Sequence, residues 1–422
     1  MKKRRIYLDY ASLTPIDPRV IREMKAYSSQ TYANPSSLYR EGVAAHTALN
    51  EGRTRTAAFL HAHPDEILFT SGGTEANGLA LEGAGRTAHC SGIKKPHLIV
   101  SAVEHSSVLE VADMMERHGT EVTRLGVNEA GIISLDELKR ALKPDTFMVS
   151  IMTVNNEIGT IQPIREIAKI IRQARERFRG TASGTSASPY PLFHTDAAQA
   201  ASFMDLNAEK LGVDLLTLDG SKAYGPRGIS CLYVKRGTPI EPIMYGGGQE
   251  SGLRSGTENI PSIMGFAKAL DIASSLREKE SMRINHLKAG FAADLKAIRP
   301  DITVNPSEEE QASGALSKSG KNVATFQKSQ NGDAAFATLV QAPHILNVSI
   351  PGIDNEFFVL QMDARGIACS TKSSCLRDQD ESYVLKAIGV DSKTSVRFSF
   401  GRWTKESDIK KALSAVKEVL NK

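Results

Sequence analysis

The stretch "DLLTLDGSKAYGPRG", from Asp214 to Gly228, decides the fold and places one lysine in an unusual position. Its Leu- and Thr-rich beginning predicts a buried strand that ends at Gly220, and a glycine- and proline-containing turn leads to "ISCLYVK", which predicts another strand. Lys222 lies in this turn, directly after the first strand. A lysine there is normally a solvated loop residue. A chemical role for Lys222 therefore depends on the residues that lie at the other strand ends.

Strand-like runs alternate with amphipathic helices from about residue 40 to residue 235. One helical segment, "PIREIAKIIRQARERFRG", has apolar residues at helical spacing, with Pro163 at its start and Gly180 at its end. The alternation predicts an α/β fold in which helices cover a mainly parallel sheet. The strand-like runs are "EILFTSG", "HLIVSAVEH", "EVTRLGV", "TFMVSIM", "PLFHTD", "DLLTLDG" and "ISCLYVK".

The pattern changes after about residue 270, where long charged helices and a few strands replace the alternation. We therefore predict a large α/β domain over residues 23–270 and a smaller α+β domain made of residues 1–22 and 271–422. Two polar segments, residues 180–191 and 303–343, are expected to be inserted loops. Within the second, "GALSKSGKN" is similar to a phosphate-binding loop, but its glycine spacing is wrong and Asn322 stands where Ser or Thr should follow the lysine.

The composition is typical of a globular protein, since 41% of the 422 residues are hydrophobic, 24% are charged and the net charge is +4. Basic residues cluster only in "KKRR" near the start, so we expect no nucleic-acid binding. No apolar run reaches the length of a membrane span and no signal peptide is evident, which predicts a cytoplasmic protein. We expect neither a disulfide framework nor a metal site from the scattered cysteines, Cys90, Cys231, Cys369 and Cys375.

Polar residues follow several of the predicted strands, at the point where each strand ends. Because the carboxyl ends of parallel strands meet at one edge of an open α/β sheet, where ligands bind, we expect these residues to lie together. Taken alone, each also has a structural interpretation as a helix cap, a turn former or a surface residue. The residues are Ser71 to Asn77, His105, Asn155 to Glu157, Asp196 to Gln199, and Lys222.

Together these residues describe the chemistry of a pyridoxal phosphate site. A Gly-Gly-Thr turn at residues 72–74 opens a helix, so it presents N–H groups and the positive end of the helix dipole to a phosphate. A lysine amine such as that of Lys222 forms Schiff bases, and an aspartate such as Asp196 keeps a pyridine nitrogen protonated, so that the ring accepts electrons. The sequence therefore predicts pyridoxal 5'-phosphate as the cofactor.

Long motifs in a fixed order extend this interpretation. They include "VSIMTVNNEIGTIQPI" and "GGGQESGLRSGTEN", together with "LDYASLTP", "NPSSLYREG", "EILFTSGGTEAN", "VEHSSVLE", "HTDAAQA", "GSKAYGPRGI" and "SVRFSFGR". In these motifs the chain resembles the cysteine desulfurases of the class V aminotransferase family, from about residue 6 to the C-terminus apart from the two insertions. The resemblance implies fold type I of the pyridoxal phosphate enzymes and a homodimer.

For the cofactor, the resemblance implies a covalent bond to Lys222, a pairing of Asp196 with the pyridine nitrogen and a contact of Gln199 with the ring hydroxyl. His105 would stack on the ring and move protons. The remaining cofactor contacts, most of them to the phosphate, would come from Gly73, Thr74, Asn156, Ser221 and, from the neighbouring subunit, Thr257.

For the substrate L-cysteine, the resemblance implies Asn34, Asn156 and Arg397 as binding residues. A planar guanidinium holds an α-carboxylate through two parallel hydrogen bonds, although a structural ion pair is the alternative for Arg397. Cys375 falls where the family carries its catalytic cysteine, and as a thiolate it would attack the sulfur, leave an enzyme persulfide and release alanine. The sulfur would pass to an acceptor protein such as an iron–sulfur scaffold or a tRNA-thiolation enzyme.

Three positions near the site depart from the family pattern. The family usually has a hydroxyl residue where Asp219 stands and histidines where Ser221 and Tyr39 stand. An ionised Asp219 would oppose a nearby phosphate unless its carboxylate points away or pairs with Arg227 or Arg254. Two other interpretations therefore stay open: another class V activity, such as selenocysteine lysis or transamination, and a dimeric scaffold without cofactor.

Overall fold

The computed structural model describes residues 5–179, 189–307, 341–372 and 381–421. Its main element is a seven-stranded sheet with the strand order β2-β8-β7-β6-β5-β3-β4. Strand β8 pairs antiparallel with β2 and β7, whereas the other neighbours pair parallel, which confirms the predicted mainly parallel sheet. The strands are Ile67–Thr70 (β2), His97–Ser101 (β3), Glu121–Leu125 (β4), Thr146–Ser150 (β5), Leu192–Asp196 (β6), Leu215–Asp219 (β7) and Ser230–Val234 (β8).

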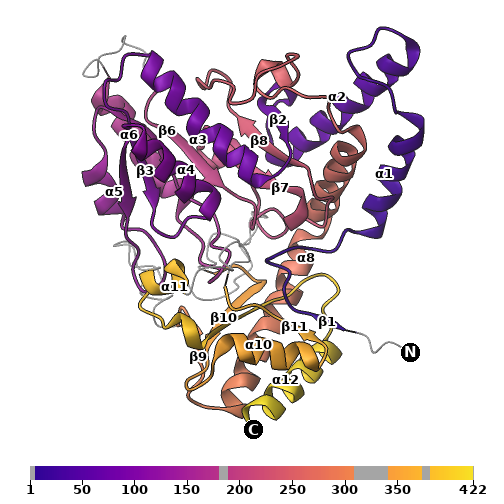
Figure 1. Cartoon of the computed structure of the whole chain (residues 1–422), viewed down its shortest axis with the longest axis vertical. Helices are drawn as coiled ribbons and strands as arrows, with labels where there is room; N and C mark the ends of the chain where they lie inside the picture. The colour runs from indigo at the N-terminus through magenta and orange to yellow at the C-terminus, as the bar shows by residue number, and fades with distance from the viewer. Residues whose placement is uncertain (1–4, 180–188, 308–340, 373–380, 422) are drawn as a thin grey trace, which may run out of the picture.

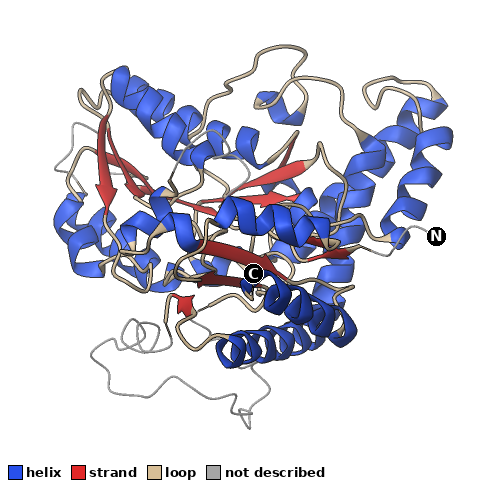
Figure 2. Cartoon of the chain, turned by 60° about the horizontal axis from the view of Figure 1, so that its bottom comes forward, coloured by secondary structure: helices blue, strands red, loops and turns tan. Residues whose placement is uncertain are grey.

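Helices cover both faces of this sheet, because every residue of β3, β5 and β6 is buried and neighbouring residues of a strand point to opposite faces. Ile99 therefore packs in one core and Leu98 and Val100 pack in another. Figure 2 shows the strands inside the molecule with helices around them. The core on one face includes α2 (Arg40–Leu60), α6 (Ile164–Phe178) and α7 (Ala208–Leu211). The core on the opposite face includes α3 (Gly73–Cys90) and α4 (Ser106–Arg117).

Helix α6 confirms the apolar periodicity of its sequence. Ile164, Ile167, Ile171 and Ala174 are buried, and Pro163 directly precedes the helix. The predicted end at residue 180 lies outside the described residues. Other elements in this part of the chain are α1 (Pro18–Gln30), α5 (Leu135–Ala141) and the 3-10 turns η1 (Pro64–Glu66), η2 (Gly220–Lys222) and η3 (Glu250–Gly252).

Helix α8 (Ile260–Ile298) runs from the large sheet to a second core (Figure 1). Its first half packs on α1 and α2, and its second half contributes Ile284, Leu287 and Phe291 to the second core. That core covers an antiparallel sheet with the order β12-β10-β9, and a strand near the N-terminus, β1, pairs parallel with β11. The elements here are β1 (Ile6–Tyr7), β9 (Thr303–Asn305), β10 (Ile345–Ser349), α10 (Asn355–Ala364), β11 (Ile367–Ala368), α11 (Tyr383–Ala387), η5 (Ser392–Thr394), β12 (Ser395–Ser399) and α12 (Glu406–Leu420).

The division into two domains stays a prediction, and both of its boundaries fall inside helices. Residue 22 lies in α1 and residue 270 lies in α8, so neither is a linker. Residues from both ends of the chain, including Ile6 and Val416, meet in the second core. Although α8 has 39 residues, no helix in the described part of the chain is both long and apolar enough to span a membrane.

The outer parts of the two expected insertions belong to the fold, which corrects their predicted bounds. Thr303–Asn305 forms β9 and pairs with β10. At the other end of the same segment, Gln341 and Ala342 are buried, and Tyr190 in the first segment is also buried. The sequence predicted these residues as loop because they adjoin long polar stretches. Residues 180–188 and 308–340 lie outside the described residues.

Candidate active site

A cavity of about 200 Å³ lies at the carboxyl ends of β2, β3, β5, β6 and β7. The structure thus brings together the polar strand ends that the sequence suggested, as the parallel sheet requires. Asn34 and Thr257 are exposed and are not part of its lining, and Cys375 lies outside the described residues. The predicted site residues in the lining are Gly73, Thr74, His105, Asn156, Asp196, Gln199, Ser221, Lys222 and Arg397.

Lys222 ends the turn η2 and is half-buried, so it is not a solvated loop residue. Asp219 caps this turn, because its carboxylate accepts a hydrogen bond from the N–H of Ser221 at 2.7 Å. The Nζ of Lys222 donates to the carbonyl oxygen of Ala11 at 3.1 Å and to that of Ser12. These carbonyls hold the amine at the cavity wall, where it can react with a carbonyl ligand.

Asp196 ends β6 and is only 8% exposed. Its Oδ1 accepts from the N–H of Ala198 at 2.9 Å, and its Oδ2 accepts from Nδ2 of Asn77 at 2.8 Å. Both donors are neutral, and each oxygen keeps a lone pair for a further donor. Burial, together with the nearby Asp196 carboxylate, raises the pKa of Glu104 to about 8.

The N-terminus of α3 opens into the cavity beside Asp219. Gly73 and Thr74 are its first residues, and the first N–H groups of a helix have no partner within the helix. The Oδ2 of Asp219 lies 3.4 Å from the backbone nitrogen of Gly73 and accepts its hydrogen bond. Asp219 therefore neither points away nor pairs with Arg254, which binds Glu75 at 2.7 Å. The protein places a carboxylate beside the amide that a phosphate would use.

His105 lines the cavity and also caps α4, whereas its role in proton transfer stays a prediction. The Nδ1 of its ring accepts a hydrogen bond from the backbone N–H of Ser107 at 3.2 Å and lies 2.8 Å from the Ser107 hydroxyl. The ring orientation is therefore fixed by the first turn of α4.

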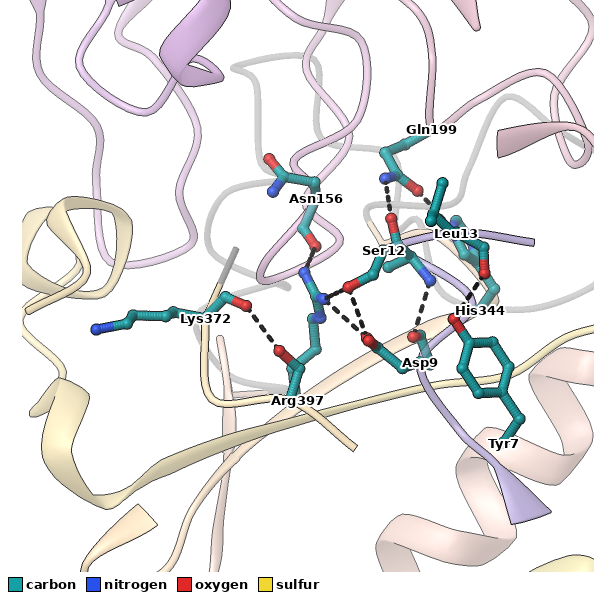
Figure 3. Close-up of polar contacts among 12 residues, drawn as sticks. Tyr7, Asp9, Ser12, Leu13, Asn156, Gln199, His344, Lys372 and Arg397 are labelled. Atoms are coloured by element: carbon teal, nitrogen blue, oxygen red, sulfur yellow. Dashed lines mark hydrogen bonds and ion pairs between the residues drawn. The ribbon is translucent and has the colours of Figure 1, made fainter. Parts of the chain in front are cut away.

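Arg397 lies in the middle of β12 and is 1% exposed (Figure 3). Its guanidinium donates to the carbonyl oxygen of Asn156 at 2.7 Å, to the hydroxyl of Ser12 at 2.8 Å and to Asp9 at 3.0 Å. The ion pair with Asp9 agrees with the structural alternative, yet the same side chain lines the cavity. Its Nε is buried and has no hydrogen-bond partner within the described residues, so it remains available to an acceptor.

Gln199 is held by a residue that the sequence analysis missed. His344 lies 3.1 Å from Oε1 of Gln199, and Nε2 of Gln199 donates to the carbonyl oxygen of Ala11 at 2.9 Å (Figure 3). Burial, with the nearby charges of Lys288 and Arg397, lowers the pKa of His344 to about 3. The ring is therefore neutral and donates to Gln199. No local sequence pattern marks His344, because its partner is 145 residues away.

The described cysteines do not contribute to the cavity. Cys231 and Cys369 are buried, and burial raises the pKa of both thiols. Cys90 is exposed at the C-terminal end of α3, whose N-terminal end faces the cavity. None of the three lines the cavity, whereas the position of Cys375 lies outside the described residues.

The described residues on both sides of positions 373–380 are anchored next to the cavity. Before these positions, the N–H of Ser370 donates to the backbone oxygen of Arg397 at 3.1 Å. After them, the hydroxyl of Ser382 donates to Oε2 of Glu157 at 2.6 Å, and both groups are buried. Arg397 and Asn156 line the cavity, and Glu157 follows Asn156 in the sequence. Both anchors are therefore next to residues of the cavity.

Comparisons with known proteins agree with this geometry. Residues 6–331 match the family model described as Aminotransferase class-V. The cysteine desulfurase IscS of Dictyoglomus turgidum is 35% identical over 425 residues, which cover 100% of this chain and 95% of that protein. The mitosomal cysteine desulfurase of Trachipleistophora hominis is also 35% identical, over 98% of this chain and 87% of its own.

Solved structures show the same architecture. A NifS-like protein superimposes with a TM-score of 0.83 at 29% identity and covers 99% of both chains. The structure titled "SspA in complex with cysteine" has a TM-score of 0.70 at 29% identity and covers 94% of this chain and 98% of its own. The shared fold is α/β with a mainly parallel sheet covered by helices. With a family match over most of its length and full-length relatives above 30% identity, the chain belongs to the aminotransferase class-V family.

Proposed function

We propose that this protein is a pyridoxal phosphate-dependent cysteine desulfurase that converts L-cysteine to L-alanine and passes the sulfur on. One observation carries the proposal: Lys222, Asp196, His105 and Arg397, from separate elements of the fold, converge on one cavity. Full-length relatives named cysteine desulfurase support the same conclusion.

The donors and acceptors of the cavity fit pyridoxal phosphate at its ring end. Lys222 brings an amine to the cavity wall, and Asp196 offers a buried carboxylate with spare lone pairs for a ring N–H. Gln199 is held with its amide in the lining. At the phosphate end, Gly73 and Thr74 open α3, and helix N-termini favour anions. When bound, the cofactor supplies an electron sink for the bonds at the α-carbon of the substrate.

Arg397 is the group that we assign to the substrate carboxylate. Its buried Nε lacks an acceptor within the described residues, and a carboxylate accepts from a guanidinium more strongly than a carbonyl does. Asn156 adjoins it in the lining and is our second substrate residue. The neighbour solved in complex with cysteine supports this choice of substrate.

Cys375 is our proposed sulfur acceptor within the chain. As a thiolate it attacks Sγ of the substrate, a new S–S bond forms and the Cβ–Sγ bond breaks. The electron pair left on Cβ takes up a proton, which yields alanine and an enzyme persulfide. The anchors at Ser370 and Ser382 support this role, since they hold both flanks of the segment beside the cavity. An acceptor protein, such as an iron–sulfur scaffold or a tRNA-thiolation enzyme, then takes the sulfur.

A second copy of the chain completes our proposal. Thr257 and Asn34, which the resemblance assigns to the cofactor and substrate, are exposed and do not reach their own cavity. Large apolar side chains near them are also exposed: Tyr32 is 77% exposed, Leu38 is 95% exposed and Tyr245 is 71% exposed. A homodimer that buries these residues would bring Thr257 to the partner's phosphate site.

The test is the measurement of alanine and sulfide from L-cysteine by the purified protein supplied with cofactor and a reductant. Cys375→Ser should abolish both products, whereas the matched variant Cys90→Ser should retain them. Alanine and sulfide production that survives Cys375→Ser would defeat the persulfide step and favour another class V activity. A cofactor absorption band that Lys222→Ala does not remove would refute the role of Lys222, and the absence of any band would favour a scaffold.

A further inference from the structure

Asn77 connects Asp196 with Ser107, which in turn contacts His105. It determines the direction of the hydrogen bonds in this series. It is 1% exposed on α3, and its Nδ2 donates to Oδ2 of Asp196 at 2.8 Å and to Oγ of Ser107 at 2.9 Å. An ionised carboxylate only accepts hydrogen bonds, so the Nδ2 group, and not Oδ1, must face Asp196. Both hydrogens of this amide group are therefore used.

The proton positions at His105 follow from this arrangement. Because Oγ of Ser107 accepts from Asn77, its single hydrogen is free to point at Nδ1 of His105, which lies 2.8 Å away. The backbone N–H of Ser107 also donates to Nδ1, at 3.2 Å, and a backbone N–H can only donate. Two donors thus converge on Nδ1, which carries no proton. In the neutral ring the proton is on Nε2.

We propose that Asn77 and Ser107 are positioning residues that hold His105 as its neutral Nε2–H tautomer. The inference rests on the function proposed above, in which His105 moves protons in the cavity. It adds which nitrogen does so: Nδ1 is enclosed by the first turn of α4, so exchange with the cavity takes place at Nε2, and the ring begins as a hydrogen-bond donor. A second proton on Nδ1 would face both donors of Ser107 and is disfavoured.

The arrangement also ties His105 to Asp196 through neutral groups. Asp196 fixes the Asn77 amide, the amide fixes the Ser107 hydroxyl, and the hydroxyl fixes the ring. Other charged groups line the same cavity, namely Lys222, Asp219 and Arg397. Because none of them is changed in the variants below, those variants test the Ser107 contact alone.

The experiment is a two-bond proton–nitrogen NMR correlation on the full chain labelled with 15N-histidine, with and without cofactor. His105→Gln identifies the His105 signals. The wild type should show a protonated Nε2 and an unprotonated Nδ1. Ser107→Ala removes one of the two donors to Nδ1 and keeps the backbone N–H. It should therefore increase the fraction of the Nδ1–H tautomer and raise the midpoint of the His105 titration by about half to one pH unit, the equivalent of one lost hydrogen bond.

Two matched variants complete the design. Ser107→Thr keeps the hydroxyl and should restore the wild-type tautomer, whereas Ser106→Ala removes a neighbouring hydroxyl and should change neither tautomer nor midpoint. A wild-type Nδ1–H tautomer, or identical spectra for Ser107→Ala and Ser106→Ala, would overturn the inference. The readout needs no turnover, so a protein with the expected tautomer but without desulfurase activity refutes the proposed function and leaves this inference intact.

Discussion

Asp219 should weaken the binding of the cofactor phosphate, and Asp219→Asn should strengthen it. The Oδ2 of Asp219 already accepts the Gly73 N–H at 3.4 Å, so an anion using the same N–H must come within about 4 Å of that carboxylate. Two unit charges about 4 Å apart repel by about 4 kcal/mol at an effective dielectric constant of about 20. Asp219 is partly exposed, so solvent screening reduces the repulsion to about 1.5–3 kcal/mol, or roughly 10- to 100-fold in the dissociation constant.

The assay is an equilibrium titration of the cofactor-free protein with pyridoxal phosphate, followed by absorbance. Asn at position 219 keeps an oxygen that can cap η2 through the Ser221 N–H, so the turn that carries Lys222 is retained. Pyridoxal, which lacks the phosphate, should bind the variant and the wild type equally. Asp294→Asn, which removes an exposed carboxylate from α8, is the charge control. The reasoning is refuted if Asp219→Asn binds pyridoxal phosphate no more tightly than the wild type, or if pyridoxal gains as much.

Three further changes test the site and its support. Burial raises the pKa of Glu104 to about 8, so the protonated carboxyl contributes fully to the stability of the fold below about pH 4.5, and this contribution is lost as the pH rises through 8. Glu104→Gln does not titrate, so its free energy of unfolding should rise relative to that of the wild type between pH 5 and pH 8, by about 3–5 kcal/mol at most. Urea denaturation measures this difference, and a difference that does not depend on pH would contradict the prediction. Arg397→Lys should raise the KM for L-cysteine roughly 10- to 100-fold with less effect on kcat, because lysine lacks the Nε–H that Arg397 offers to the carboxylate. An unchanged KM would exclude Arg397 from carboxylate binding. Glu250→Ala leaves the partly buried Arg53 without its 2.7 Å partner and should lower the free energy of unfolding by about 3–5 kcal/mol. Asp65→Ala, which breaks an exposed ion pair, should leave the denaturation midpoint unchanged. Equal effects of the two variants would show that burial does not determine the strength of these pairs.

The large sheet could be predicted from the sequence because its signal is local. The strands β3, β5 and β6 are buried at every position, and each contains a short apolar run, LIV, FMV or LF, as is typical of strands covered on both faces. The polar residues that follow these strands were expected to lie close together, because the carboxyl ends of parallel strands are at the same edge of the sheet. By contrast, β9 was missed because a three-residue strand next to a long polar segment has no periodicity of its own.

Several contacts of the site could not be predicted, because they join distant segments. Arg397 binds Asp9, which is 388 residues away, and His344 binds Gln199. Neither contact leaves a local pattern in the sequence. The orientation of Asp219 could not be predicted either. The sequence analysis expected its carboxylate to form an ion pair or to point away from the phosphate, whereas in the structure it caps η2 and faces the N-terminus of α3.

The central claim is that sulfur from L-cysteine is transferred to Cys375. The most direct measurement is mass spectrometry of the cofactor-supplied protein after brief exposure to L-cysteine without reductant, with the modified peptide identified. The account predicts one added sulfur atom on the peptide that contains Cys375, in step with the alanine formed, and none in Lys222→Ala. Alanine formation with an unmodified Cys375 peptide, or sulfur on Cys90 instead, would contradict it.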